Sequence, residues 1–439
     1  MASLGIRDVS VVFASRVAVA VGGLALQSCL AWFLGTSGRG SYAVCVMYTM
    51  LLSTLCTFGV DGSAQYFVAS RKLSISEGIS ALVSLEAVGA ILGLVGGIAL
   101  LYLPIEFFNK ASHAAFIIAV AAIPAQMLLG SLELTLAAQR EFSFAALISA
   151  TNMLLRLILT VVLVRVVQLG VHGALVANLL TFTLGGLAIL TFLRRRHHLH
   201  WVAPSWAHLR RMLGYGGRYY FAAFGMIVNF QIGSIMIAFF ASRDDVGLFH
   251  SAVTLIVQVI MISDVVGSVI HPRIASEPGG RPELAAQSAR IVGMICGGII
   301  LVFLIVAKPT VGLLLSPEFL PTVPVLWILG PGVVYRAATK VFVHYLKATD
   351  RPGVFSVSTI FGALVNLTLL AVLLPVMGLE GAALAMTIGY LCTGTVLMRS
   401  FLKHSGMSFA HCWRVRRGDF DLLVRAMGQI QRRALRRDR

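Results

Sequence analysis

The sequence is dominated by apolar runs of about 20 residues or more, which recur from one end of the chain to the other. A helix of that length crosses the hydrocarbon core of a bilayer, which is about 30 Å thick. The runs are continuous and lack the alternation of membrane β-barrel strands. Only 12% of the 439 residues are charged, against roughly 25% in a typical soluble domain. The sequence therefore predicts an all-α polytopic membrane protein.

We expect about twelve transmembrane helices, because twelve apolar runs are long enough to span. The first run is too long for a cleavable signal peptide, and no small-residue cleavage site follows it. The predicted spans cover residues 9–34, 42–69, 77–103, 113–137, 143–166, 171–193, 214–241, 247–272, 288–307, 322–347, 354–376 and 380–402.

The positive charge is distributed in a way that fixes a membrane orientation rather than a nucleic-acid surface. The formal net charge is +17, and most of the 35 Lys and Arg residues fall on the side that carries both termini. Such a bias places that side in the cytoplasm by the positive-inside rule. We therefore expect both termini to be cytoplasmic and no nucleic-acid partner. Few basic residues fall on the opposite side: Arg39, Lys110, Arg165, Arg243 and Lys308.

Two pairs of similar segments indicate an internal repeat. "GVHGALVA" (170–177) opens the sixth span, and "GLEGAALA" (378–385) opens the twelfth, 208 residues further on. Gly40 and Gly247, which open the second and eighth spans, are 207 residues apart. Because six is even, two six-helix copies would enter the membrane in the same direction, related by a pseudo-twofold axis along the membrane normal. This is the architecture of an alternating-access carrier.

The repeat sets the predicted domain boundaries. Its copies form an N-terminal lobe over 1–193 and a C-terminal lobe over 214–403, joined by a basic cytoplasmic linker over 194–213. Residues 404–439 form a basic cytoplasmic tail. Apolar residues recur at helical spacing between arginines over 420–437, which favours an amphipathic helix on the anionic inner leaflet. A basic tail with no role beyond topology is the alternative.

Motifs of enzymes and metal sites are missing from the sequence. It contains no GxxxxGK[ST] phosphate loop, no HExxH and no GxSxG. The six cysteines are scattered without CxxC spacing, which predicts neither a disulfide framework nor a metal site. We therefore expect a membrane transporter without a catalytic residue, a metal or another cofactor, apart from H⁺ or Na⁺ as an optional coupling ion.

Cations inside the predicted spans suggest a binding site, because a buried charge needs water or a partner. In the tenth span Arg336, Lys340 and His344 recur at intervals of four, on one helix face. Such a row suits an aqueous cavity that receives a phosphate group; the alternative for Lys340 and His344 is snorkelling to the interface. Arg156 lies about 21 Å along its span by helical rise. It requires a cavity or a buried ion pair.

Arg16 is the cation of the first span, about 11 Å from its cytoplasmic start by helical rise. Three roles are open for it: phosphate binding, an ion pair with Asp61 at a similar depth in the second span, and snorkelling. The predicted cationic substrate-binding site comprises Arg16, Arg156, Arg336 and Lys340.

Carboxylates in the spans have two candidate roles. Asp61, Glu86 and Asp264 could each take up H⁺ or Na⁺ to couple transport, or each could neutralise a neighbouring arginine. Glu133 lies nearer the cytoplasmic end of its span and is expected to be structural. Gly59, two residues before Asp61, permits a kink or a close helix approach.

Several segments resemble one transporter family. They are "AWFLGTSGRGSYAVCVMYTMLLSTLCTFGVDGSAQYFVASRK" (31–72), "QREFSFAALISATNMLLRLILTVVLV" (139–164), "QLGVHGALVANLLT" (168–181) and "VGLFHSAVTLIVQVIMISDVVGSVIHPRIAS" (246–276). Together they resemble the polysaccharide-transporter branch of the MOP flippase superfamily, the Wzx-type oligosaccharide flippases. Phe249 stands where many members of that branch have Tyr.

The resemblance implies a MATE/MOP-like fold of two lobes and a function. Members flip undecaprenyl-pyrophosphate-linked oligosaccharide across the bacterial inner membrane for synthesis of surface polysaccharides such as the O-antigen of lipopolysaccharide or exopolysaccharide. The partners it implies are the lipid-linked oligosaccharide, membrane lipids and other polysaccharide assembly proteins. Two alternatives stay open: a MATE-like multidrug/cation antiporter, for which carboxylates rather than cations would line the cavity, and a non-transporting scaffold of a polysaccharide assembly complex.

Overall fold

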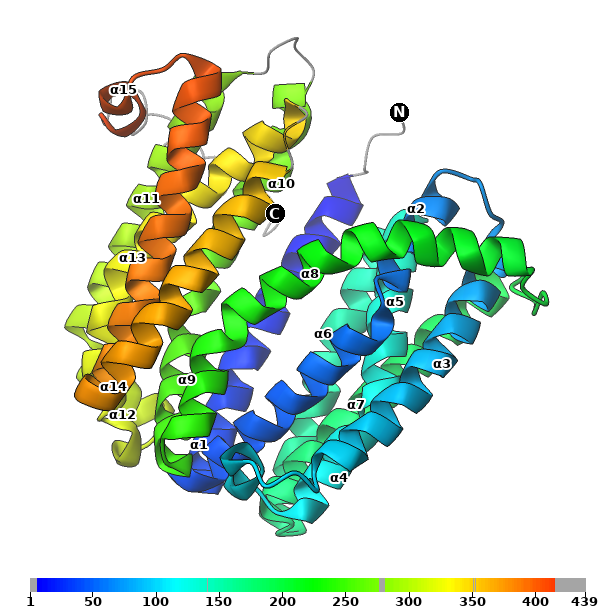
Figure 1. The fold of residues 1–439 in the computed structure, drawn as a ribbon, viewed down its shortest axis with the longest axis horizontal. Helices are drawn as coiled ribbons and strands as arrows, with labels where there is room; N and C mark the ends of the chain where they lie inside the picture. The colour runs from blue at the N-terminus through cyan, green and yellow to red at the C-terminus, as the bar shows by residue number, and fades with distance from the viewer. Residues whose placement is uncertain (1–5, 140, 276–280, 350, 352, 415–439) are drawn as a thin grey trace, which may run out of the picture. The chain divides into compact units, whose positions relative to one another are not determined.

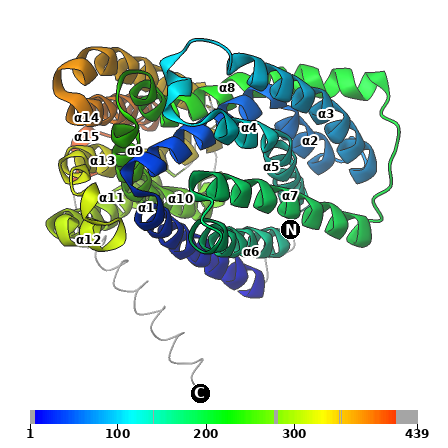
Figure 2. The same ribbon diagram turned by 90° about the horizontal axis from the view of Figure 1, so that it is seen from below.

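The computed structural model describes residues 6–139, 141–275, 281–349, 351 and 353–414. Every regular element in these ranges is helical (Figures 1 and 2), so the predicted all-α class is confirmed. In chain order the elements are α1 (Ile6–Thr57), α2 (Val60–Ala69), α3 (Ile75–Leu100), η1 (Glu106–Lys110), α4 (His113–Ala121), α5 (Ile123–Ala138), α6 (Phe142–Thr160), η2 (Val161–Val166), α7 (Gly170–Arg196), α8 (Trp206–Phe240), α9 (Arg243–Val257), η3 (Gln258–Ile260), α10 (Met261–Ala275), α11 (Pro282–Ile305), α12 (Ala307–Leu314), η4 (Pro317–Phe319), α13 (Thr322–Ala348), α14 (Gly353–Ser405) and α15 (Phe409–Trp413).

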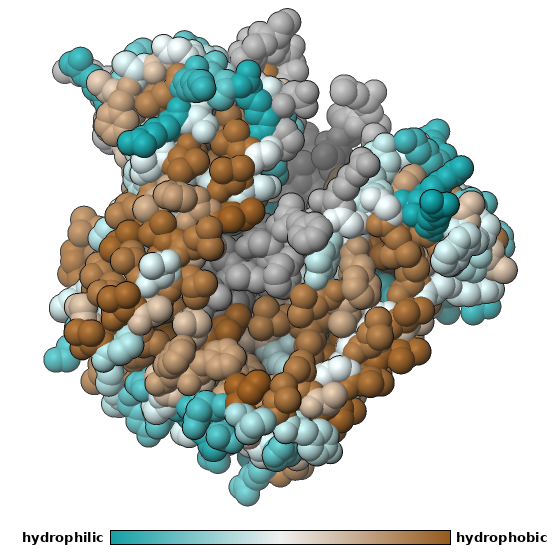
Figure 3. Space-filling view, viewed as in Figure 1, coloured by the Kyte–Doolittle hydropathy of each residue, from teal (hydrophilic) through white to brown (hydrophobic). Residues whose placement is uncertain are grey.

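Within the described ranges, nine helical segments are long and apolar enough to cross a membrane. Hydrophobic residues cover the middle of the helices of the first part of the chain, and hydrophilic residues gather at the helix ends (Figure 3). The chain is therefore a multi-pass membrane protein, as predicted. The nine segments are Ala14–Thr57, Ile75–Leu100, His113–Ala138, Phe142–Val166, Gly170–Arg196, Arg243–Asp264, Pro282–Ile305, Thr322–Ala348 and Gly353–Ser405.

Helix α1 is a hairpin of two helices rather than one rod. Its direction changes at Gly35, whose φ of 64° and ψ of −173° are non-helical. Beyond this turn Arg39 donates a hydrogen bond from Nη2 to Oε1 of Gln27. In a straight helix twelve residues span about 18 Å, so this contact requires the chain to fold back. Glycine supports the turn because a positive φ costs it little.

Helix α14 folds back in the same way at Gly378, which has φ 58° and ψ −137°. The two arms pack closely, since a Cβ added at Gly362 would lie 2.8 Å from the carbonyl oxygen of Gly389. Small residues at such positions let two membrane helices approach. Each of the two longest helical segments therefore contains two stretches of spanning length.

The predicted second span is interrupted just before Asp61. Helix α1 ends at Thr57, and α2 begins at Val60 after two residues with positive φ, Phe58 at 48° and Gly59 at 70°. A Cβ at Gly59 would lie 2.3 Å from the carbonyl oxygen of Gly216 on α8. Gly59 was expected to permit a kink or a close helix approach, and the structure has both at this residue.

The chain divides into two compact units, which we describe separately. Unit 1 contains residues 1–251 and 311–322, and unit 2 contains residues 252–310 and 323–439. One apolar cluster of unit 1 joins α3, α5, α6 and α7; it comprises Ile79, Leu129, Leu132, Leu136, Ile148, Ile189 and Leu193. In unit 2 the rings of Phe342 and Phe401 stack at 4.2 Å and join α13 to α14.

The domain boundaries predicted from the repeat differ from this division and stay predictions. The difference arises because α8 and the start of α9 pack with the preceding helices. The predicted amphipathic helix over 420–437 lies outside the described residues.

Within unit 1 the two repeat glycines meet. A Cβ at Gly40 would lie 1.9 Å from the carbonyl oxygen of Arg243, and a Cβ at Gly247 would lie 2.2 Å from that of Thr36. Each glycine thus contacts the carbonyl four residues before the other. We call this the reciprocal glycine contact. The hydroxyl of Thr36 also donates to Asp244 Oδ1 at 2.5 Å.

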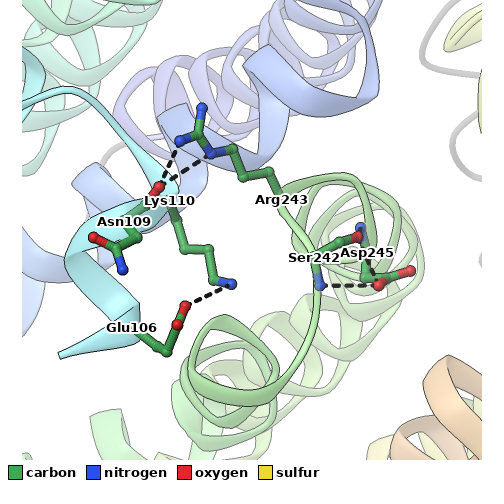
Figure 4. Close-up of polar contacts among 6 residues, drawn as sticks. All are labelled: Glu106, Asn109, Lys110, Ser242, Arg243 and Asp245. Carbon is green, nitrogen blue, oxygen red and sulfur yellow. Dashed lines mark hydrogen bonds and ion pairs between the residues drawn. The ribbon is translucent and has the colours of Figure 1, made fainter.

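Side chains near the start of α9 reinforce the reciprocal glycine contact (Figure 4). Arg243 donates from Nε and Nη2 to the carbonyl oxygen of Asn109, at 3.2 and 2.5 Å. Ser242 and Asp245 cap the start of α9, with the Ser242 backbone N–H 3.0 Å from Asp245 Oδ2. The end of η1, the α1 turn and the start of α9 are therefore held together.

Candidate functional site

The candidate site of unit 1 is a buried polar cluster on α1, α6 and α7, centred on Arg39. The turn at Gly35 brings Arg39 back into the helix bundle, where 1% of the residue is exposed. Its guanidinium carbon lies 5.5 Å from the centre of the Tyr42 ring, a favourable cation–π distance. Its hydrogen bond to Gln27 is to a neutral acceptor.

Tyr42 connects the three helices through its hydroxyl oxygen. That oxygen accepts hydrogen bonds from Arg156 Nη2 at 2.8 Å and from Asn178 Nδ2 at 2.9 Å. Helices α6 and α7 approach closely because Gly185 leaves room for Asn152: a Cβ at Gly185 would lie 2.3 Å from Asn152 Nδ2. The small residue therefore allows α6 to present Arg156 to Tyr42 and Asn178.

The cluster retains unused hydrogen-bonding capacity. Arg39 Nε, Arg156 Nε and Asn178 Oδ1 are buried without a hydrogen-bond partner among the described residues. Among the described residues no carboxylate pairs with Arg39 or Arg156, and the two guanidinium groups lie near enough to repel each other. Buried cations without an anion are unfavourable. The arrangement is therefore suited to an anion that accepts N–H bonds from both groups.

Arg39 was not predicted from the sequence, because a charge next to the "GTSGRG" turn was assigned to the side opposite the termini. One signal was available: Tyr42 follows Arg39 by three residues, so the two share a helix face. Arg156, by contrast, was predicted. The structure adds its neighbours Tyr42 and Asn178.

Arg16 lies apart from this cluster within the described part of the chain. It is exposed on the first arm of α1, and no hydrogen bond or ion pair joins it to Asp61 there. Asp61 lies in the first turn of α2, and its Oδ1 is buried without a hydrogen-bond partner among the residues that the structure describes. The break at Phe58–Gly59 separates the helix of the second span into two parts. The predicted ion pair between Arg16 and Asp61 assumed two straight helices with both residues at equal depth, and the break removes that assumption.

Glu86 on α3 is one of the most deeply buried carboxylates, with 5% of the residue exposed. Its Oε1 accepts a hydrogen bond from the hydroxyl of Ser131 on α5, and its Oε2 has no partner. Asp61 lies close enough for the two charges to interact. In the described residues neither carboxylate pairs with an arginine, so both retain free oxygen atoms.

Unit 2 contains the predicted cations of the tenth span on one face of α13. Lys340 Nζ lies 2.7 Å from Asp264 Oδ2 and forms an ion pair. Arg336, one turn earlier, has 3% of its surface exposed, and its Nη1 has no hydrogen-bond partner in the part of the chain that the structure describes. His344, one turn later, lies beside His271, with ring centres 6.1 Å apart. The carboxylate of this region therefore neutralises a lysine.

Comparison with known proteins identifies solved structures that share this fold and a family that matches the sequence. The lipid II flippase MurJ, in an inward closed conformation, superposes with a TM-score of 0.75 at 16% identity, covering 91% of this chain and 90% of that one. An inward-facing multidrug resistance MATE family transporter of the MOP superfamily gives 0.66 at 15% identity, over 88% and 96%. At these identities the likeness shows the fold alone, and the MOP-type fold is confirmed.

A curated relative is the probable low-salt glycan biosynthesis flippase Agl15 of Haloferax volcanii, 22% identical over 205 residues. The aligned region covers 45% of this chain and 43% of that protein, less than half of its length. Residues 6–277 match the family described as polysaccharide biosynthesis protein. Fold and family are those of flippase-type transporters rather than enzymes, as predicted. The chain belongs to the polysaccharide biosynthesis protein family.

Proposed function

We propose that the protein flips an undecaprenyl-pyrophosphate-linked oligosaccharide from the cytoplasmic to the outer leaflet for synthesis of a surface polysaccharide. The observation that supports this most is a pair of arginines, the buried Arg39 and the half-buried Arg156, without a carboxylate partner among the described residues. Guanidinium groups bind phosphate oxygens through short, charge-assisted hydrogen bonds. A pyrophosphate provides the two anionic groups that two unpaired arginines need.

The translocation would proceed by alternating access of two six-helix lobes. Counting each hairpin as two spans and adding α8 gives twelve spans, in lobes over 1–193 and 214–403. The reciprocal glycine contact supports a pseudo-twofold axis, because such an axis would exchange Gly40 with Gly247, and each packs on the carbonyl four residues before the other. The glycan would cross between the lobes while the prenyl chain stays in lipid.

The membrane would be the bacterial inner membrane, with both termini in the cytoplasm by the charge bias. In that orientation the reciprocal glycine contact lies at the outer side and must open to release the substrate. Arg39 directly precedes Gly40, so opening would expose its guanidinium as the pyrophosphate arrives. The burial of Arg39 in the present conformation fits a receptor used at the outer side.

The other predicted cations would act earlier. Arg16 is exposed and would meet the substrate from the cytoplasmic side, followed by Arg336. Lys340 would contribute less, because Asp264 already neutralises it. Transport would be coupled to H⁺ or Na⁺ through Asp61 and Glu86, each of which keeps a buried oxygen without a hydrogen-bond partner.

The test is export in a strain that lacks the gene and carries the Arg39→Gln/Arg156→Gln double variant. We expect lipid-linked glycan to accumulate and surface polymer to be lost. The matched control is Arg165→Gln, which removes an exposed cation on η2 near α6. Both variants are compared at equal protein levels in the membrane.

Three results would contradict the proposal. Normal export in the double variant would exclude this arginine pair as the receptor. Drug sensitivity without a glycan defect in the deletion strain would favour a multidrug antiporter. The third result is restored polymer synthesis in the deletion strain by a variant that cannot transport but still assembles correctly. That result would favour a scaffold within the polysaccharide assembly machinery.

A further inference from the structure

Unit 1 contains a second site, at the C-terminal end of α7. A pocket of about 820 Å³ is lined by α3, the last turns of α7 and the loop that leads to α8. Its wall is apolar and comes from two membrane-spanning helices: Ile79 and Val83 of α3, and Leu187 and Leu190 of α7. Lined this way, it can receive a hydrocarbon chain.

The loop that closes one end of this pocket is fixed to α3. The backbone N–H of His200 donates to the hydroxyl of Ser76 at 3.3 Å, and that of Val202 donates to the hydroxyl of Ser80 at 3.1 Å. Two backbone hydrogen bonds one helical turn apart on α3 hold the extended segment along it. The pocket is therefore a built feature of the fold.

The rim of the pocket is cationic. Arg194 and Arg195, in the last turn of α7, line the pocket together with His200 and Trp201. The next two residues already lie beside a carboxylate, since Arg196 Nε and His197 Nε2 are 3.9 and 3.5 Å from Glu141 Oε1. Within the described residues Arg194 and Arg195 have no carboxylate partner.

Arginines at the C-terminal end of α7 could also be explained without a ligand, because cations there interact favourably with the helix dipole. This interaction would not create an apolar pocket beneath them, nor a tryptophan with 63% exposure at its edge. Tryptophan is enriched where a membrane meets water. Cations, an interfacial tryptophan and an apolar wall occur together where a lipid head group and its chain bind.

We propose that this pocket binds an anionic phospholipid. The lipid would belong to the membrane leaflet in which the C-terminal end of α7 lies. The phosphate would lie between Arg194 and Arg195, and one acyl chain would follow the wall formed by Val83, Leu187 and Leu190. A soluble phosphate compound would use the rim alone and leave the wall empty. The site is independent of the proposed transport route, because none of its residues belongs to the arginine cluster.

The test is native mass spectrometry of the full-length protein in detergent, titrated with phosphatidylglycerol or phosphatidylcholine. We expect retained phosphatidylglycerol, and on the order of tenfold weaker retention in Arg194→Gln/Arg195→Gln. The matched control is Arg210→Gln/Arg211→Gln, which removes two adjacent exposed arginines of α8 outside the pocket. Equal losses in both variants would overturn the proposal in favour of general surface charge.

A second variant tests the wall without changing the charge. Leu187→Trp fills the pocket from a side chain that is 51% exposed, so the fold should tolerate it. Phosphatidylglycerol retention should fall about as far as in the arginine variant. Unchanged retention, or full competition by soluble glycerol phosphate, would overturn the assignment to a phospholipid. Phosphatidylcholine retained as well as phosphatidylglycerol would overturn its anionic character.

Discussion

The two units bury cations in different ways. In unit 1, Arg39 and Arg156 are surrounded by neutral acceptors and an aromatic ring, and two guanidinium N–H groups remain unpaired. In unit 2, the Lys340 ammonium pairs with Asp264 at 2.7 Å. A charge neutralised inside the protein has little capacity left for a ligand. The difference therefore separates two arginines without a carboxylate partner in unit 1 from a lysine that Asp264 compensates in unit 2, where Arg336 also keeps an unpaired Nη1 among the described residues.

The largest expected effect comes from removing the unpaired charges of unit 1. Arg39→Gln/Arg156→Gln should lower glycan export by about 100-fold or more, since a buried charge pair with substrate is lost. Thermal stability should change by about 1 kcal/mol, because the hydrogen bonds to Gln27 and Tyr42 are lost but no carboxylate is left without a partner. Export is measured by surface polymer, and stability by thermal unfolding in detergent.

The equivalent change in unit 2 sharpens the comparison. Arg336→Gln/Lys340→Gln leaves Asp264 without its cation, so this variant should lose more stability and less export than the variant of unit 1. Equal export losses would show that the paired lysine is also available to the substrate. The distinction between the two units would then fail.

The next effect is the coupling between Asp264 and Lys340. A double-mutant cycle with Asp264→Asn and Lys340→Met should give an interaction of about 1 kcal/mol in stability. The value is modest because the Asp264 side chain is 46% exposed and solvent screens it. Thermal unfolding of the four proteins measures it, and a coupling of zero would mean that the pair does not compensate charge.

A similar effect is expected at Tyr42. Tyr42→Phe removes the oxygen that accepts from both Arg156 and Asn178 and should cost about 1–2 kcal/mol. Thr49→Val is a matched control on the same helix, since its hydroxyl bonds only to backbone carbonyls. If the tyrosine variant were no less stable than this control, the hydroxyl would not organise the cluster.

The positions of the helices could be predicted from the sequence, but the contacts between their side chains could not. Apolar run length decides where a helix lies in the membrane, so most predicted spans lie within a few residues of an observed helix, although α8 and α11 begin eight and six residues before the spans predicted there. Contacts depend on how each helix is rotated and bent. The turn at Gly35 brings Arg39 inward, and the break at Phe58–Gly59 ends the simple geometry that would pair Asp61 with Arg16.

The repeat shows the same division between pattern and contact. Gly40 and Gly247 are recognisable as equivalents by their spacing, yet spacing does not show that they touch. In the structure Gly40 packs on the carbonyl oxygen of Arg243, and Gly247 packs on that of Thr36. Only a residue without a Cβ permits such a contact. The same holds for the carboxylates. The sequence predicts that Glu86 and Asp264 are charges within spans, but only the packing of the helices makes Ser131 the partner of Glu86 and Lys340 the partner of Asp264.

The smallest expected effect is at Arg16, a cation that lies in neither cluster. Because it is exposed and has no partner among the described residues, Arg16→Gln should change stability by less than about 0.5 kcal/mol. If Arg16 meets the pyrophosphate before the inner arginines do, export should still fall a few-fold at limiting substrate and recover when the substrate is abundant. An export assay over a range of lipid-linked glycan levels tests this. A loss that abundance does not relieve would place Arg16 with Arg39 and Arg156, and no loss at any level would leave it as a cation that merely reaches the membrane surface.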